Sequence, residues 1–123
     1  MSLTEYHPIY VRLEEQDDVV IATFTVEHLS DEENVEQLGH ELFTLVDQFG
    51  YQRLVLDLGN VTYVTSSVVG KIITLHRKLH RNEGILAVCN LGDTVARVMR
   101  TSKLLEYFNV ADDVDKAIEI VSS

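Results

Sequence analysis

Three consecutive hydroxyl residues, Thr65, Ser66 and Ser67, precede an apolar stretch with helical spacing. Serine and threonine oxygens at the start of a helix accept hydrogen bonds from backbone amides that have no intrahelical partner. One hydroxyl is enough for this capping role, and three are present. The same helix end carries partial positive charge, so it also accommodates a phosphate on a serine. The segment therefore indicates either a helix cap or a phosphorylation site.

A second candidate for chemistry is the pair His76 and His80, whose spacing of four residues can place two imidazoles on one metal ion. No third ligand is evident, and His76 falls on the apolar side of a helical wheel. We therefore expect a half-buried histidine at the margin of the core, with no metal and no cofactor. The sequence also has no Gly-x-Ser-x-Gly elbow and no glycine-rich phosphate loop, so we expect no enzyme.

Asp57 ends an apolar run, at the place where response-regulator receiver domains carry their phosphoacceptor aspartate. Receivers also need a pair of acids after their first strand and a lysine after a late strand, to hold magnesium. Here Asp17 and Asp18 precede a strand, and no lysine follows residues 108–110 before the next helix. A receiver-like domain phosphorylated on Asp57 is kept as an alternative.

The elements that position these residues follow from hydrophobic periodicity. Strands are predicted over residues 10–13, 19–24, 53–58, 85–90 and 108–110, and the polar residues 14–18 join the first two as a hairpin. Helices are predicted over about 30–49, 66–81, 94–101 and 114–121. Ser30 with Glu33 indicates a capping box, Gly50 a helix end, and Asp112 or Asp113 a cap on the last helix.

The order of elements is β-β-α-β-α-β-α-β-α, which predicts an α/β domain with a mostly parallel sheet and an N-terminal hairpin strand at one edge. In such sheets, functional groups gather in the loops at the carboxyl ends of the strands. Three loops qualify, at residues 25–30, 59–67 and 91–94. A chain of 123 residues without a linker or repeat fits one domain, residues 1–123.

Composition limits the partners. The net charge is -10, from 20 acidic and 10 basic residues, which disfavours nucleic acid and anionic membranes. The one cysteine, Cys89, lies in an apolar run and forms no internal disulfide, as suits a reducing cytoplasm. With no apolar run long enough to span a bilayer and no signal-peptide pattern at the start, we expect a cytoplasmic protein.

The stretch from Leu56 to Gly70, LDLGNVTYVTSSVVG, resembles the signature of the STAS domain of bacterial anti-sigma factor antagonists. Similarity continues through residues 85–90, 95–101 and 104–110, and the element order matches from about residue 10 to residue 121. The resemblance implies a regulator of sigma-factor-dependent transcription. It would bind an anti-sigma factor that is also a serine kinase, lose this binding on phosphorylation, and be restored by a phosphatase.

Carried over by position, the resemblance places the phosphorylated serine on Ser66, with Ser67 and Thr65 as secondary candidates. The partner-binding residues that it implies lie in or directly beside the three loops and are Thr65, Ser66, Ser67, Val68, His28, Asn90 and Asp93. Thr65 stands where the family has an acid and Val68 where it has a glycine. A STAS module that is not phosphorylated and serves only in assembly is therefore a third interpretation.

The oligomeric state is left open by the sequence. One apolar group near the end of the chain could supply either core or a contact patch, and we expect mostly core: Leu104, Leu105, Tyr107 and Phe108.

Overall fold

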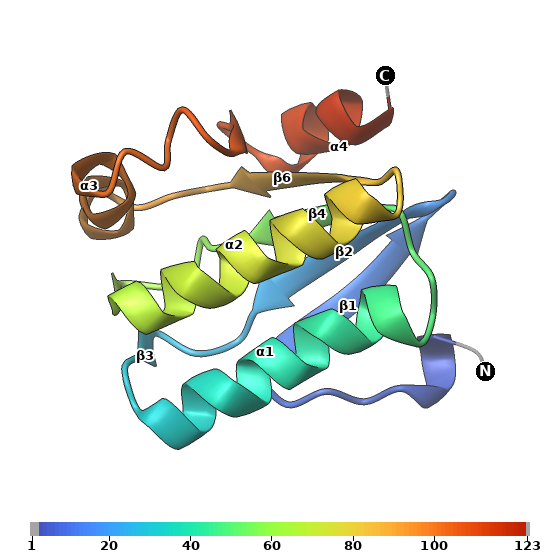
Figure 1. The fold of residues 1–123 in the computed structure, drawn as a ribbon, viewed down its shortest axis with the longest axis horizontal. Helices are drawn as coiled ribbons and strands as arrows, with labels where there is room; N and C mark the ends of the chain where they lie inside the picture. Colours follow the sequence, from blue (N-terminus) through green and yellow to red (C-terminus); the bar gives the residue numbers. More distant parts are fainter. Residues whose placement is uncertain (1–2, 123) are drawn as a thin grey trace.

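A computed structural model describes residues 3–122 and shows a five-stranded sheet with the strand order β1-β2-β4-β6-β7 (Figure 1). The strands are β1 (Val11–Gln16), β2 (Val19–Phe24), β4 (Arg53–Asp57), β6 (Ile85–Cys89) and β7 (Asn109–Ala111). Neighbouring strands from β2 to β7 are parallel, whereas β1 pairs antiparallel with β2 at the edge. The α/β class, the element order and the hairpin edge strand are as predicted.

Helices lie on both faces of the sheet (Figure 1). Helices α1 (Glu32–Asp47) and α2 (Ser66–Arg81) cover one face, and α4 (Val114–Ser122) covers the other. The larger apolar core lies under α1 and α2, and a smaller one, containing Val55, Ala87 and Cys89, lies under α4. Helix α3 (Asp93–Thr101) stands beyond the end of β6. Both faces of the central strands are therefore buried, which explains their continuous apolar sequences.

The first hairpin is tighter than predicted. Strand β1 continues through Gln16, so the polar residues 14–16 are paired with β2 and only Asp17 and Asp18 form the turn. Asp17 has a φ of 55°, the left-handed conformation that such a short connection favours. The prediction that all of residues 14–18 form the loop was wrong, because the end of an edge strand can pair its backbone with the neighbouring strand while its polar side chains stay exposed.

The helix ends agree with the sequence in part. The N-cap of α1 is Asp31, whose Oδ1 accepts a hydrogen bond from the amide of Glu33 at 2.9 Å, so the expected cap on Ser30 was wrong. Gly50 adopts a φ of 70° just beyond the last turn, as expected of a helix-ending glycine. Asp113 accepts a hydrogen bond from the amide of Lys116 at 2.9 Å at the start of α4, which confirms one of the two caps proposed there.

Two further strands were not predicted from the sequence. Strand β3 (His28–Leu29) pairs in parallel with β5 (Tyr63–Val64) to form a second, two-stranded sheet. Strands of two residues are too short for an alternating pattern, so periodicity cannot reveal them. None of the helices described in residues 3–122 is long and apolar enough to cross a membrane.

Candidate functional site

The loops that follow β2, β4 and β6 lie at the same edge of the sheet, because these three strands are parallel neighbours. The loop after β4 contacts the loop after β2 through backbone hydrogen bonds. The amides of Thr62 and Tyr63 donate to the carbonyl of Glu27 at 2.8 and 3.2 Å, and the amide of Thr65 donates to the carbonyl of Leu29 at 3.2 Å. The second sheet therefore fixes the backbone that leads directly into α2.

Asp57 and Asn90 join the loops after β4 and β6. Asp57 Oδ1 accepts hydrogen bonds from the amide of Gly59 at 2.9 Å and from Asn90 Nδ2 at 3.0 Å. Asn90 has a φ of 56°, a left-handed conformation that asparagine tolerates better than most residues. The carboxylate thus has a structural role, in which it holds two loops together.

The residues that start α2 are Thr65, the N-cap residue, and then Ser66 and Ser67, whose side chains are exposed. No side chain caps this helix, although the N-cap residue has the extended backbone conformation of a cap. The expectation that a hydroxyl oxygen caps the first turn was therefore wrong. As a result, the first amides of α2 keep their capacity to donate to another acceptor.

The hydroxyl of Thr65 is unusual in another way. Its Oγ1 is buried and has no hydrogen-bond partner among the described residues. Buried polar atoms are nearly always hydrogen-bonded in folded proteins, so this oxygen marks a place where the local structure is not optimised for stability. Because this hydroxyl is buried, a kinase cannot reach it as it can reach the exposed hydroxyl of Ser66.

The first turn of α2 carries no side-chain charge that would repel an anion. The first turn of α2 has no acidic residue, whereas Lys78, His80 and Arg81 lie in the last turn. The helix dipole places partial positive charge at its N-terminus, and no carboxylate of the first turn offsets it. A phosphate attached to Ser66 would therefore meet free amides and no repelling side chain of its own turn.

The other partner-binding residues predicted from the sequence divide into two groups. The side chains of His28 and Asp93 are exposed, and that of Asn90 is half-buried. Val68, by contrast, has an exposed fraction of 0% and belongs to the core. A fully buried side chain cannot touch a partner, so Val68 is left out of the contact surface proposed below.

Tyr63 was missed by the sequence reasoning. Its side chain is 45% exposed, and its ring centroid lies 6.0 Å from that of His28 on the paired strand. The two rings form an exposed aromatic surface, and Tyr63 lies three residues before Ser66. The alternation of exposed Tyr63 and buried Val64 would have indicated a strand if more residues had followed the same pattern.

The pair His76 and His80 does not form a metal site with other side chains. Within residues 3–122, no group of three or more histidine, cysteine, aspartate or glutamate side chains is placed to hold a metal ion. His76 is half-buried, and its ring lies 4.8 Å from the ring of Tyr107. Burial, aided by the nearby charges of His80 and Arg77, lowers the pKa of His76. The expected histidine at the core margin is confirmed.

Cys89 is fully buried, as predicted for a strand residue. Burial, together with the charges of Asp57 and Asp113, raises the pKa of its thiol to about 12. Because the thiolate is the reactive form of cysteine, this side chain is not a nucleophile at neutral pH.

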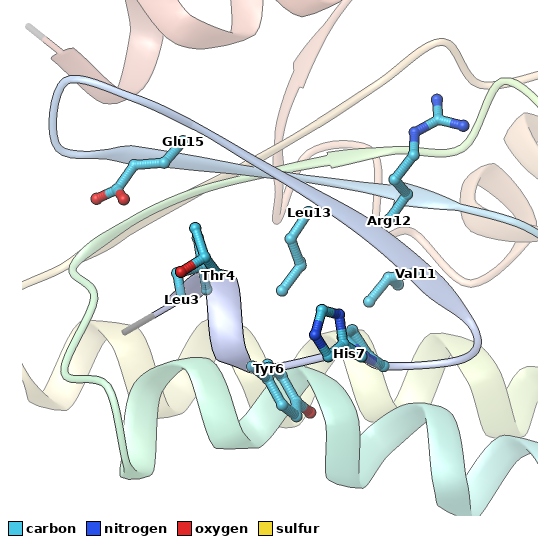
Figure 2. A pocket seen from close by; sticks show the side chains of 9 residues that line it. Leu3, Thr4, Tyr6, His7, Val11, Arg12, Leu13 and Glu15 are labelled. Carbon is cyan, nitrogen blue, oxygen red and sulfur yellow. The ribbon is translucent and has the colours of Figure 1, made fainter. Parts of the chain in front are cut away.

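A pocket beside the edge strand contains none of the predicted site residues. It lies between the N-terminal 3₁₀ helix η1 (Leu3–Glu5) and β1, with the Tyr6 ring directed toward α1 (Figure 2). The side chains of its two charged lining residues, Arg12 and Glu15, lie far apart in this view. Tyr6 donates a hydrogen bond to the carbonyl of Glu41 at 3.0 Å, which attaches this segment to α1. The pocket offers no grouping of acid, base or nucleophile.

Comparison with known proteins identifies relatives across most of the chain. Residues 10–117 match the protein family described as the STAS domain. BtrV of Bordetella bronchiseptica, assigned as an anti-sigma factor antagonist, is 36% identical over 84 residues, which are 68% of this chain and 72% of BtrV.

Solved structures agree. A Thermotoga maritima protein assigned as an anti-sigma factor antagonist has a TM-score of 0.81 and 23% identity, with coverage of 92% of this chain and 95% of that one. The Bacillus cell fate determinant SpoIIAA, solved in its phosphorylated form, has a TM-score of 0.69 and 23% identity, with coverage of 90% and 98%. At these identities, the structures establish a shared fold.

Proposed function

The chain belongs to the STAS family of anti-sigma factor antagonists, and from this premise we propose that it binds an anti-sigma factor with serine kinase activity and is released when Ser66 is phosphorylated. In this proposal it is a regulator and not an enzyme. The contact surface consists of the start of α2 and the loops beside it, with these residues: His28, Tyr63, Thr65, Ser66, Ser67, Asn90 and Asp93.

One observation carries the choice of Ser66. It is an exposed serine at the first position of α2, beside amides that no side chain caps. A kinase can reach such a hydroxyl without unfolding the domain, and the phosphate that it adds is stabilised by the helix end by about 0.3–1 kcal/mol. The phosphorylated form of SpoIIAA, a protein with the same fold, also supports this reading.

The proposed switch acts through charge at the surface. A phosphate adds about 1.5 to 2 negative charges at neutral pH and three acceptor oxygens. Because the first turn of α2 has no acidic residue of its own, a partner would meet an uncharged first turn on the unmodified chain and a dianion on the phosphorylated chain. A partner that buries this turn would then have to desolvate the dianion, and its affinity would fall.

A pull-down with anti-sigma factor kinases of the same cell tests the proposal. We expect wild-type protein and Ser66→Ala to bind the cognate kinase, and Ser66→Asp to bind at least about tenfold more weakly. Ser67→Ala and Ser67→Asp are matched controls, because Ser67 is also exposed and lies one residue along the same turn. Equal binding by the Ser66→Ala and Ser66→Asp variants would rule out the switch.

The two alternatives predict other results. A receiver-like domain would be phosphorylated on Asp57, but this carboxylate is engaged with Gly59 and Asn90, and the chain belongs to another family. An assembly module without modification would show no phosphate. Intact-mass measurement of protein from its own host distinguishes this case, because a fraction heavier by one phosphate contradicts it.

A further inference from the structure

A groove of about 670 Å³ lies along the second half of α2, away from the proposed contact surface. Its lining consists of Thr74, His76, Arg77, His80, Arg81 and Tyr107. No carboxylate lines it, although the chain has 20 acidic and 10 basic residues. The groove is therefore a local concentration of positive charge on an acidic protein, and attracts anions.

The basic side chains of α2 fall into two sets. Lys71 forms an ion pair with Glu36 at 2.8 Å, and Lys78 with Asp47 at 3.0 Å, so both lysines are neutralised by α1. Arg77 and Arg81 line the groove and form no ion pair with any residue in the described part of the chain. Two guanidinium groups four residues apart on one helix are therefore available to a ligand.

Aromatic rings lie beside these arginines. The His76 ring lies 4.8 Å from that of Tyr107 and 5.8 Å from that of Phe108. His76 Nδ1 is buried without a hydrogen-bond partner among the described residues, and such atoms in native structures call for an explanation. Of the apolar group that was expected to be mostly core, Phe108 is buried and Leu104 and Leu105 pack against the core, whereas Tyr107 is the exception, with 43% of its surface exposed. The groove thus combines an exposed ring with two unpaired cations.

We propose that this groove binds a small organic phosphate, with the phosphate held by Arg77 and Arg81 and the organic part packed on Tyr107. Guanidinium groups recognise phosphate through paired, charge-assisted hydrogen bonds. The volume lies within the range of roughly 300–1,000 Å³ found for small-molecule sites. The proposal does not rest on phosphorylation of Ser66, because Arg77 lies about 16 Å further along the axis of α2.

An NMR titration of the ¹⁵N-labelled full chain tests the proposal with three probes: phenyl phosphate, inorganic phosphate and benzyl alcohol. We expect phenyl phosphate to bind most tightly, because only it has both an anion and a ring. Amide shifts should map to residues 74–81 and to Tyr107. The same titration of Ser66→Asp should give the same affinity, which separates this site from the proposed switch.

Variants identify the arginines. Arg77→Gln and Arg81→Gln should each weaken phenyl phosphate binding by about tenfold, the value of one charge-assisted hydrogen bond. Arg97→Gln is the matched control, because Arg97 is an exposed arginine of α3 outside the groove and has no ion pair in residues 3–122. It should bind as the wild type does.

Three results would overturn the proposal. The first is that no amide shifts at about 10 mM phenyl phosphate, a concentration at which even weak, millimolar binding is detected. The second is that the Arg77→Gln, Arg81→Gln double variant binds phenyl phosphate with unchanged affinity. The third is that the shifts map outside the groove. A short peptide of aspartate and glutamate that binds the groove more tightly than phenyl phosphate would also overturn it, in favour of an acidic protein segment as the ligand.

Discussion

Asn90 Nδ2 donates a hydrogen bond to Asp57 Oδ1 at 3.0 Å, and this contact joins the ends of β4 and β6 beneath the loop that leads to Ser66. The same Oδ1 accepts the amide of Gly59 at 2.9 Å. One carboxylate oxygen therefore sets the path of the chain as it leaves the sheet. The structure therefore gives Asp57 a positioning role.

Replacing Asp57 should show this role. Asp57→Ala leaves the Gly59 amide and the Asn90 side chain without their acceptor, so we expect a loss of about 1–3 kcal/mol in the free energy of unfolding. Asp57→Asn keeps a carbonyl oxygen at the same place and should lose less. Urea denaturation of both variants measures the difference, and an unchanged stability of Asp57→Ala would contradict the role given to this contact.

Much of this edge of the sheet could be predicted from sequence. The apolar stripe of α2 predicted a helix over residues 66–81, and the structure confirms these bounds. Parallel order followed from alternating strands and helices, and that order alone brought Asp57, Ser66 and Asn90 into neighbouring loops.

Other features depend on contacts that a linear pattern does not contain. The pairing of His28 with Tyr63 joins residues 35 positions apart through strands of two residues each. Asp31 rather than Ser30 caps α1, because both types suit the role and only the backbone path selects one. Tyr107 and Phe108 are adjacent and both aromatic, yet the first is exposed and the second buried.

Gly84 precedes β6 in a place where a side chain does not fit. A Cβ at this position would lie 2.6 Å from the carbonyl oxygen of Gln52. We expect Gly84→Ala to lower the free energy of unfolding by about 1–3 kcal/mol, as overpacking does. Gly70→Ala is the matched control, because a Cβ there meets nothing within 4 Å, and in the middle of α2 it should stabilise by about 0.5–1 kcal/mol. If thermal unfolding ranked the two variants in the opposite order, this packing would be wrong.

Cys89 should make the protein sensitive to alkali. Its pKa is raised from 9.0 to about 12, so between these values the unfolded chain loses a proton that the folded chain retains. Stability should therefore fall as pH rises through this window, by at most about 4 kcal/mol from this thiol. Tyr6 and Tyr51, whose pKa values are also raised by burial, add to the loss.

The variant Cys89→Ser separates the thiol from the tyrosines, because a serine hydroxyl does not titrate in this range. Chemical denaturation at several pH values should show a shallower alkaline decline for Cys89→Ser than for the wild type. Identical slopes would show that the thiol does not keep its proton in the folded protein.

His76 should act in the opposite pH range. Its pKa is lowered from 6.5 by burial, so as pH falls below 6.5 the unfolded chain binds a proton that the folded chain does not. Stability should therefore decline on acidification. His76→Phe keeps a ring against Tyr107 and removes the titrating group, so its acid decline should be smaller, whereas the same change at the exposed His7 should have little effect. Parallel acid profiles for His76→Phe and wild type would contradict the assignment.

The most direct test of the proposed switch uses protein with phosphoserine incorporated at position 66. We expect a melting temperature equal to or slightly above that of the unmodified chain, because the free amides of α2 donate hydrogen bonds to the phosphate oxygens. We also expect loss of binding to the cognate anti-sigma factor kinase. A melting temperature that drops by several degrees, or affinity that is unchanged by the phosphate, would contradict it.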